Sequence, residues 1–181
     1  MKKENVLNLA KILGKMKKVK RNGWIKRRVL EPESDAEHSY SLAMLTMLFA
    51  PHSLDRLRCI QLALIHDLPE VFCGDFVPGE ISDKEKSVLE QEAMDKVVRE
   101  TDLPVLAELF AEYKQQQTPE AKFVWILDRL DNVFTARFYE DSQKIALVKE
   151  FSESTYERLY YLDDAALRIE LDSMLSALNE K

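Results

Sequence analysis

Apolar residues recur every three or four positions through most of the chain, and no segment keeps the strict alternation of a half-buried strand. Ser34 and Ser82 are each followed three positions later by a glutamate, a spacing typical of capping boxes at helix N-termini. Thr118-Pro119 pairs a capping residue with a proline suited to the first helical position. Only four glycines and six prolines interrupt the pattern. The sequence therefore predicts an all-α fold.

The helical pattern divides the chain into successive segments without an internal repeat or a linker. Residues 19–34 lose the periodicity, and a loop is expected from Pro69 to Gly79. A chain of 181 residues, 46% of them hydrophobic, has enough apolar material for one core. We therefore expect a single helical domain over residues 1–181. The predicted helices cover residues 6–16, 34–51, 55–69, 82–101, 103–116, 118–140, 145–162 and 165–179.

Charge and cysteine content exclude several classes of protein. The net charge of −6 argues against a general polyanion binder. Two cysteines cannot build a disulfide framework and suit a reducing compartment. The N-terminal residues lack the apolar stretch of a signal peptide, and no apolar run approaches the roughly 20 residues that span a bilayer. We expect a soluble, cytoplasmic protein without a membrane partner.

Histidine is rare in this chain, with three residues, and two of them stand beside carboxylates. His38 lies just inside a predicted helix in "SDAEHSY", and His66 is followed at once by Asp67 in "LALIHDLPEVFCGDF". Asp128 lies among apolar neighbours in "FVWILDRLDNV". Imidazole and carboxylate together are ligands for borderline divalent metals. The spacing leaves two interpretations open: a metal site, or hydrogen-bonded His–Asp pairs.

The segment from Lys15 to Val29 contains eight basic residues and no acidic one. An arginine there, such as Arg21 or Arg27, can grip a phosphate with two parallel hydrogen bonds. Trp24 can pack on a sugar or base, or it can fill the core. A solvated charged segment remains the alternative for the whole stretch. Nucleic-acid binding is not expected, because one tryptophan in a short patch makes a poor stacking platform.

Four blocks occur in order: "RNGWIKRRV", "PESDAEHSYSLAML", "LALIHDLPEVFCGDF" and "EAKFVWILDRLDNV". Together they resemble the HD-domain metal-dependent phosphohydrolases, and more narrowly the branch of bacterial 5′-deoxynucleotidases and their eukaryotic HD-domain relatives. The resemblance covers about residues 5–150, with the helices over 145–179 expected to pack on that region. It implies an all-helical HD-domain bundle, often a homodimer, that removes phosphate from deoxyribonucleoside 5′-monophosphates.

The resemblance also implies roles for particular residues. Glu70 matches the general acid or base, and Asp75 the carboxylate that faces the substrate. Arg21 precedes Trp24 by three positions here, which fits the eukaryotic "R-x-G-W" spacing better than the bacterial pattern with arginine next to tryptophan. Substrate contacts are expected from Arg21, Trp24 and Arg27 of the basic segment. The positions that match the metal ligands are His38, His66, Asp67 and Asp128.

The histidine count narrows the choice among these relatives. Dinuclear HD proteins use additional histidines between the HD pair and the last aspartate, and positions 68–127 contain none. We therefore expect one divalent ion, such as Co²⁺ or Mn²⁺. Two alternatives to the deoxynucleotidase stay open: a phosphohydrolase acting on another nucleotide or phosphate ester, and a metal-binding scaffold without turnover.

Overall fold

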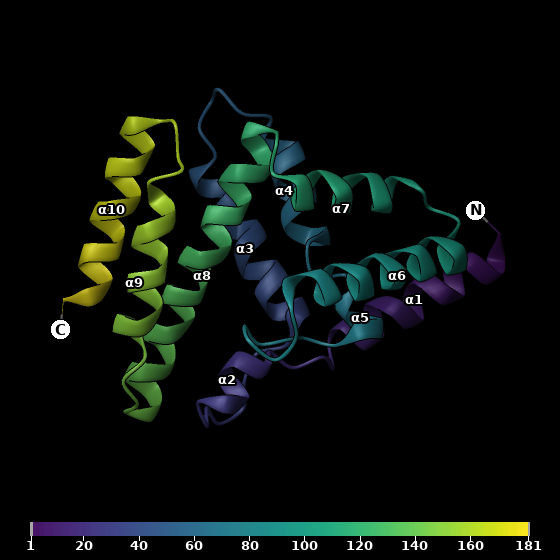
Figure 1. Ribbon diagram of the computed structural model, residues 1–181, viewed down its shortest axis with the longest axis horizontal. Coiled ribbons are helices and arrows are strands. Elements are labelled where there is room, and N and C mark those ends of the chain that lie inside the picture. The colour runs from purple at the N-terminus through teal and green to yellow at the C-terminus, as the bar shows by residue number, and fades with distance from the viewer. Residues whose placement is uncertain (1, 181) are drawn as a thin grey trace. The chain divides into compact units, whose positions relative to one another are not determined.

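The computed structural model describes residues 2–180, and the regular secondary structure among them is helical with no β-strand, as the sequence predicted. One isolated antiparallel bridge joins Lys20 to Ser34. Figure 1 labels the helices along the chain. In chain order they are α1 (Lys3–Met16), α2 (Asn22–Lys26), α3 (Asp35–Phe49), α4 (Arg56–Ile65), α5 (Glu70–Cys73), α6 (Asp83–Thr101), α7 (Val105–Gln115), α8 (Pro119–Gln143), α9 (Val148–Leu159) and α10 (Ala165–Asn179).

The helix-start signals are confirmed in atomic detail. The Ser82 hydroxyl accepts a hydrogen bond from the backbone N–H of Glu85, whose carboxylate accepts from the backbone N–H of Ser82. Ser34 and Glu37 form the same reciprocal pair at the start of α3. The Thr118 hydroxyl caps α8 ahead of Pro119. Each pair satisfies backbone donors that have no partner within the helix.

Two short helices were not predicted, and the expected helix over 55–69 ends early. α4 stops at Ile65, and the chain passes through tight turns before α5. Pro69 has a helical backbone conformation and stands before the first residue of α5, so it lies at the start of a short helix and not in the predicted loop. Gly74, with φ of 80°, ends α5 after one turn. α2 likewise has only five residues, too few for periodicity to reveal.

The predicted helix over 145–162 begins later, at Val148. A side chain of α8 accepts hydrogen bonds from the backbone N–H groups at this start. Lys144 adopts a left-handed conformation that ends α8. The Glu140 carboxylate then accepts hydrogen bonds from the backbone N–H groups of Leu147 and Val148, both at 2.9 Å. The free donors at the start of α9 are thus satisfied from α8.

The chain folds into two compact units. Unit 1 contains the chain through Tyr40 and Leu64–Lys114, and unit 2 contains Ser41–Ala63 and Gln115–Lys181. Each unit combines segments that are distant in sequence. The single domain over residues 1–181 stays a prediction.

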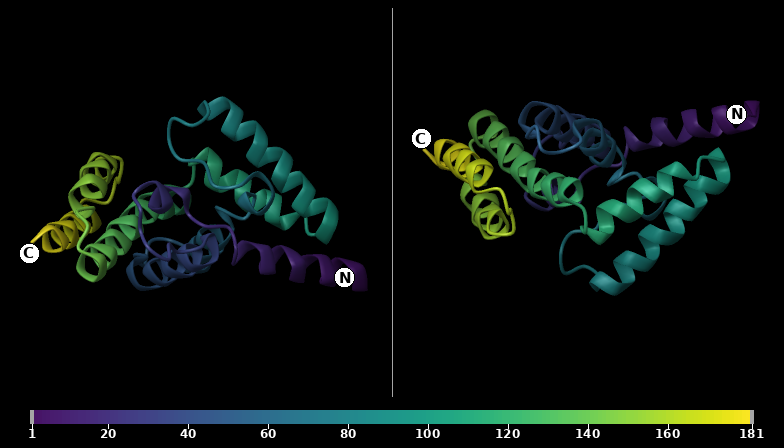
Figure 2. Two further views of the ribbon diagram at one scale, coloured as in Figure 1. Left: turned by 90° about the horizontal axis from the view of Figure 1, so that it is seen from below. Right: turned by 90° about the horizontal axis from the view of Figure 1, so that it is seen from above.

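In unit 1, α6 packs against α1 and α5, and α1 also packs against α5. In Figure 1 α1 lies along α6, and Figure 2 shows the two helices converging toward one end. Their apolar side chains include a set that is at most 5% exposed: Ile12, Met16, Ala93, Met94 and Val97. Trp24 of α2 is 2% exposed, so it is part of the core.

In unit 2, α8 packs against α9 and α10, which also pack against each other (Figure 1). The central residues of α8 are fully buried, including Phe123, Ile126, Leu127 and Leu130. This burial explains why α8, the longest described helix, is apolar on several sides. None of the described helices is long and apolar enough to cross a membrane.

Candidate metal centre and active site

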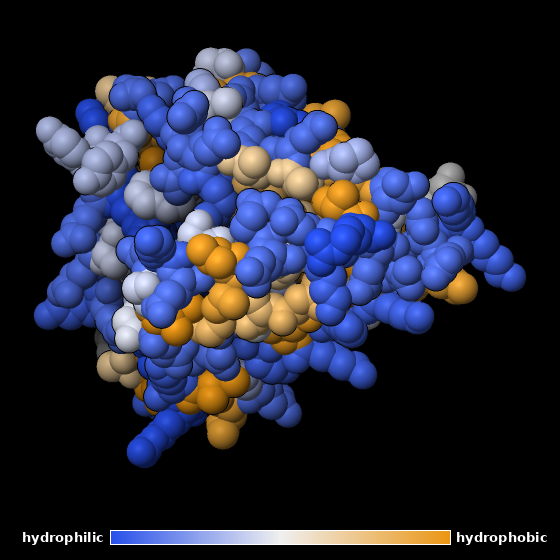
Figure 3. Space-filling model, turned by 45° about the vertical axis from the view of Figure 1, so that its right-hand side comes forward, coloured by the Kyte–Doolittle hydropathy of each residue, from blue (hydrophilic) through white to orange (hydrophobic). Residues whose placement is uncertain are grey.

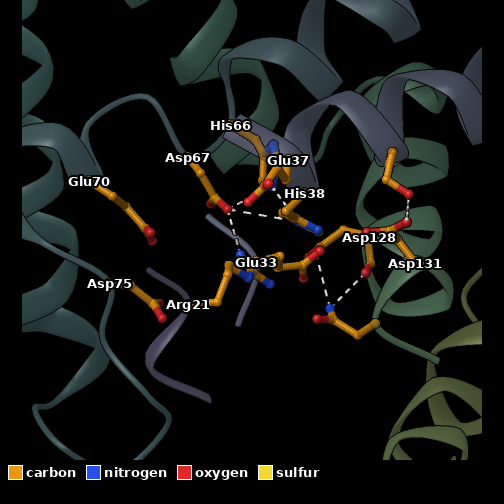
Figure 4. A network of polar contacts seen from close by, with 12 residues as sticks. Arg21, Glu33, Glu37, His38, His66, Asp67, Glu70, Asp75, Asp128 and Asp131 are labelled. Carbon is orange, nitrogen blue, oxygen red and sulfur yellow. Dashed lines mark hydrogen bonds and ion pairs between the residues drawn. The ribbon is translucent and has the colours of Figure 1, made fainter. Parts of the chain in front are cut away.

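His38, His66 and Asp67 come together in unit 1. His38 lies in the first turn of α3, and His66 follows the last residue of α4. The Nε2 atoms of the two histidines are 3.2 Å apart, and Oδ2 of Asp67 lies 3.1 Å from Nε2 of His66 and 3.8 Å from Nε2 of His38. Figure 4 shows the three side chains meeting.

These spacings fit coordination of one ion. With metal–ligand bonds near 2.1 Å, two ligand atoms lie about 3.0 Å apart at a right angle and about 3.4 Å apart at a tetrahedral angle. The three measured separations, 3.1, 3.2 and 3.8 Å, correspond to right-angle to wide-angle pairs of such ligands. Both imidazoles are buried, at 0% and 5% exposed. The cluster therefore has the geometry and donor set of a divalent-metal site.

A second group of carboxylates shares Asp67. One oxygen each from Asp35, Asp67 and Glu70 lies within 4.8 Å of the others. Asp35 is fully buried and Glu70 is 4% exposed. Neither oxygen of Asp35, nor Oε2 of Glu70, has a hydrogen-bond partner of ordinary geometry among residues 2–180. Buried carboxylates this close together are costly unless a cation or a shared proton compensates them, so this arrangement also fits a metal.

The pKa values of the three carboxyl groups are shifted in different directions. Burial raises the pKa of Asp35 to about 7, with the negative charge of Asp67 adding to it. Burial, together with Asp67, Asp35 and Asp75, raises the pKa of Glu70 well above its usual range. For Asp67 burial acts in the same direction, but His66 and the guanidinium of Arg21 outweigh it and hold its pKa below the usual range. Glu70 is thus suited to carry a proton, and Asp67 to remain an anionic ligand.

Local turns explain why Asp67 and Glu70 lie so close. After α4 the N–H of Leu68 bonds to the carbonyl of Ile65, and the N–H of Glu70 bonds to the carbonyl of Asp67 at 3.0 Å. The ring of Tyr113 packs on that of His66, with ring centroids 5.3 Å apart. These turns therefore place the Asp67 and Glu70 carboxylates near each other, with Asp67 beside His66.

Arg21 reaches the cluster through a backbone pairing. The Lys20–Ser34 bridge, with hydrogen bonds from Arg21 N–H to Glu33 O and from Asp35 N–H to Val19 O, holds the segment before α2 against the start of α3. Nη1 of Arg21 then donates to Oδ2 of Asp67 at 2.7 Å (Figure 4). Both side chains are 14% exposed. The guanidinium thus contacts a carboxylate of the metal cluster.

The other residues predicted to contact the substrate, Trp24, Arg27 and Asp75, form hydrogen bonds with residues outside the metal cluster. Nε1 of Trp24 donates to Glu33 at 2.9 Å, and its burial favours the core interpretation of this residue. Nη1 of Arg27 donates to the carbonyl of Gly23 at 2.8 Å. Asp75 accepts a 2.5 Å hydrogen bond from the backbone N–H of Asn22. The roles predicted for these residues stay predictions.

Asp128 lies on α8 in unit 2 and is 4% exposed. Its Oδ2 is 3.4 Å from Nη2 of Arg129, and Nδ2 of Asn132 donates to its backbone carbonyl at 2.8 Å. One turn on, Asp131 accepts a hydrogen bond from the hydroxyl of Ser41. The burial of Asp128 on α8 confirms the apolar setting that the sequence indicated, and its place as a fourth ligand stays a prediction.

Sequence reasoning missed two charged residues at this site. Asp35 precedes His38 by three positions on a helix, so the two share a face, and this spacing was a usable signal. Lys86 of α6 lies 3.9 Å from Oε1 of Glu70, and no sequence signal links the two.

Comparison with known proteins identifies the family to which this chain belongs. A family model described as HD domain matches residues 13–169. The human protein named 5′-deoxynucleotidase HDDC2 is 34% identical over 93% of this chain and 85% of its own length. The fission yeast 5′-deoxynucleotidase hdd1 is 35% identical over 80% of this chain and 76% of its own length. A conserved hypothetical protein from Pyrococcus furiosus has a similar structure, with a TM-score of 0.79, 31% identity and coverage of 95% of this chain and 98% of that one. The chain therefore belongs to the HD-domain family, in the group that contains the HDDC2 5′-deoxynucleotidases.

Proposed function

We propose that this protein is a metal-dependent 5′-deoxynucleotidase that hydrolyses deoxyribonucleoside 5′-monophosphates to deoxynucleoside and phosphate. The observation that carries the proposal is the convergence of His38, His66 and Asp67 on one point. It occurs in a chain whose relatives over most of its length are named 5′-deoxynucleotidases.

His38, His66 and Asp67 are proposed to hold the ion, with Asp128 as a fourth ligand. Co²⁺ and Mn²⁺ suit this mixture of imidazole and carboxylate ligands. A divalent ion bound there would polarise a phosphoryl oxygen and lower the pKa of a bound water. Arg21 helps to keep Asp67 anionic, so this carboxylate is ready to act as a ligand at neutral pH.

Glu70 is proposed to move the proton. Its raised pKa makes this carboxyl easier to protonate than an ordinary glutamate, which suits donation to the leaving 5′ oxygen. Asp75 is proposed to face the substrate. Its hydrogen bond to the N–H of Asn22 also ties the loop after α5 to the start of α2. The same residue can thus hold the segment that carries Arg21.

The phosphate is proposed to be bound by Arg21, with Arg27 contributing from the same short helical segment. The support for Arg21 is its direct contact with Asp67. Trp24, packed in the core, would support the segment that carries both arginines. Its predicted contact with the sugar is the least supported of these assignments, because it is 2% exposed.

Phosphate release from a panel of nucleotides tests the proposal. Purified protein loaded with Co²⁺ or Mn²⁺ is assayed with dAMP, AMP and dATP. We expect kcat/KM for dAMP to exceed that for AMP by at least about 10²-fold. An apolar pocket around C2′ of the sugar rejects an added 2′-hydroxyl by only about that factor. Equal values for dAMP and AMP favour a general phosphohydrolase, release from dATP favours another nucleotide substrate, and no release favours the scaffold.

A homodimer in the cytoplasm is proposed as the working form. α3 carries apolar side chains that remain exposed: Met44 at 37%, Met47 at 41% and Leu48 at 63%. Figure 3 shows apolar side chains gathered in places on a largely hydrophilic surface. A second copy covering those of α3 would remove apolar area from water. Light scattering during size-exclusion chromatography distinguishes a dimer from a monomer.

A further inference from the structure

Four charged side chains of unit 1 form a row of ion pairs that begins at Glu70 and continues through Lys86 and Glu90 to Lys114. Nζ of Lys86 lies 3.9 Å from Oε1 of Glu70 and 3.5 Å from Oε1 of Glu90. Nζ of Lys114, on α7, lies 2.6 Å from Oε2 of Glu90. The two carboxylate side chains are 4% and 9% exposed, whereas Lys86 is 32% exposed. The charges alternate in sign, so each cation lies against a buried carboxylate.

The fold fixes the position of Lys86 closely. Its backbone N–H bonds to the carbonyl of Ser82, so it lies one turn after the capping box that begins α6. Lys86 and Glu90 are four residues apart and share one face of that helix. α5, which begins with Glu70, packs directly on α6. The start of α6 is therefore set by its cap, and the first turns of the helix carry the ammonium group to Glu70.

Glu70 needs such a partner because its other neighbours are mostly acidic. Asp67 and Asp35 share its cluster, and Asp75 adds a further negative charge. The negative charges of Asp67 and Asp75 repel an anionic Glu70 carboxylate, whereas Asp35 also interacts with Glu70 through a side-chain hydrogen bond. Lys86 attracts Oε1, while Oε2 has no hydrogen-bond partner of ordinary geometry among residues 2–180. Oε1 is thus held from the side of α6.

We propose that Lys86 is a positioning residue that holds the Glu70 carboxyl in place for proton transfer, and that Glu90, anchored by Lys114, holds Lys86. This inference rests on the proposed function, because it assigns Lys86 a part in the same hydrolysis. Two other roles for Lys86 predict different kinetics. A lysine that binds the phosphate acts on KM independently of Glu70, and a purely structural ion pair acts on stability alone.

The test is a double-mutant cycle on the full-length, metal-loaded protein, with dAMP as substrate. Lys86→Met removes the charge and keeps most of the length, and Lys86→Arg keeps the charge. We expect Lys86→Met to lower kcat by roughly 10- to 100-fold, as removal of groups that orient catalytic residues does. KM and the metal content from elemental analysis should change less than about twofold, and Lys86→Arg should recover most of the rate. In a Glu70→Gln background the same substitution should lower kcat no further.

Lys84→Met is the matched control, because Lys84 is exposed in the first turn of the same helix. Its kcat should equal that of the wild type. Glu90→Gln is a second variant, expected to lower kcat less than Lys86→Met because Lys86 itself remains.

Two results would overturn the role of Lys86 while leaving the nucleotidase intact. One is an unchanged kcat in Lys86→Met, and the other is an equal loss in the wild-type and Glu70→Gln backgrounds. If the wild-type protein releases no phosphate from dAMP or any other deoxynucleotide, the proposed function fails and the role of Lys86 fails with it.

Discussion

Replacing Arg21 with alanine should destabilise the metal-free protein more than the metal-loaded protein. Arg21 donates a 2.7 Å hydrogen bond to Oδ2 of Asp67, and both side chains are 14% exposed. A hydrogen bond to a charged group contributes about 1.5–3 kcal/mol to stability. Without Arg21 the metal-free protein must keep an Asp67 carboxylate that is largely buried. We expect the free energy of unfolding to fall by about 2 kcal/mol, near the middle of that range.

A bound divalent ion would supply the positive charge that Asp67 loses with Arg21. The loss of stability in the loaded protein should therefore be less than about half of that in the chelated protein. By linkage, Arg21→Ala should keep or increase the affinity for the metal. For a chain of this size a change of about 2 kcal/mol corresponds to a shift of about 4–8 °C in Tm.

The pH dependence has a definite sign. Arg21 helps to hold the folded pKa of Asp67 below its usual range. The resulting stabilisation is complete above the unfolded pKa of about 4 and is lost as the pH falls through the folded value. The effect of Arg21→Ala on the metal-free protein should therefore be largest above about pH 5 and shrink in acid.

The assay is urea unfolding at several pH values, with chelator or with excess Mn²⁺. Lys18→Ala is the matched control, since it removes one positive charge from an exposed position in the same basic segment. It should change the unfolding free energy by less than about 0.5 kcal/mol. An Arg21→Ala protein as stable as the wild type with chelator, or an equal loss in both conditions, would refute the reasoning.

Three further outcomes are expected at the same site. His66→Ala and Asp67→Ala should each lose the metal and turnover together, and full metal occupancy by elemental analysis would remove them as ligands. Glu70→Ala should keep the metal but lose roughly 10²- to 10⁴-fold in kcat, and an unchanged kcat would exclude it as the acid or base. Burial and the charge of Glu90 raise the pKa of Cys73 to about 11. Iodoacetamide at about pH 8 should therefore alkylate Cys73 at least about 100-fold more slowly than a free cysteine of pKa about 8.5, and comparable rates would contradict its low reactivity.

The sequence alone determined the features that depend on neighbouring residues. The capping boxes at Ser34 and Ser82 begin helices as predicted, and the helix predicted over 165–179 is α10 to the residue. Caps and periodicity act within one or two helical turns, so they can be read from a short window of sequence. The ordered histidine and aspartate motifs also indicated the family, which the comparisons confirm.

The tertiary structure decided which charges meet. The sequence predicted that Arg21 binds a phosphate, and the structure adds a hydrogen bond from its guanidinium to Asp67, 46 positions away. The sequence left two roles open for Trp24, a contact with the ligand or a place in the core. Its 2% exposure in the structure favours the core. The contact of Lys86 with Glu70 joins two helices, and the sequence around neither residue predicts it. Burial and partner choice depend on segments that only folding brings together, and the energy of a charge depends on both. Local sequence therefore specifies the helices and the ligand types, while long-range packing sets the protonation and pairing of each side chain at the site.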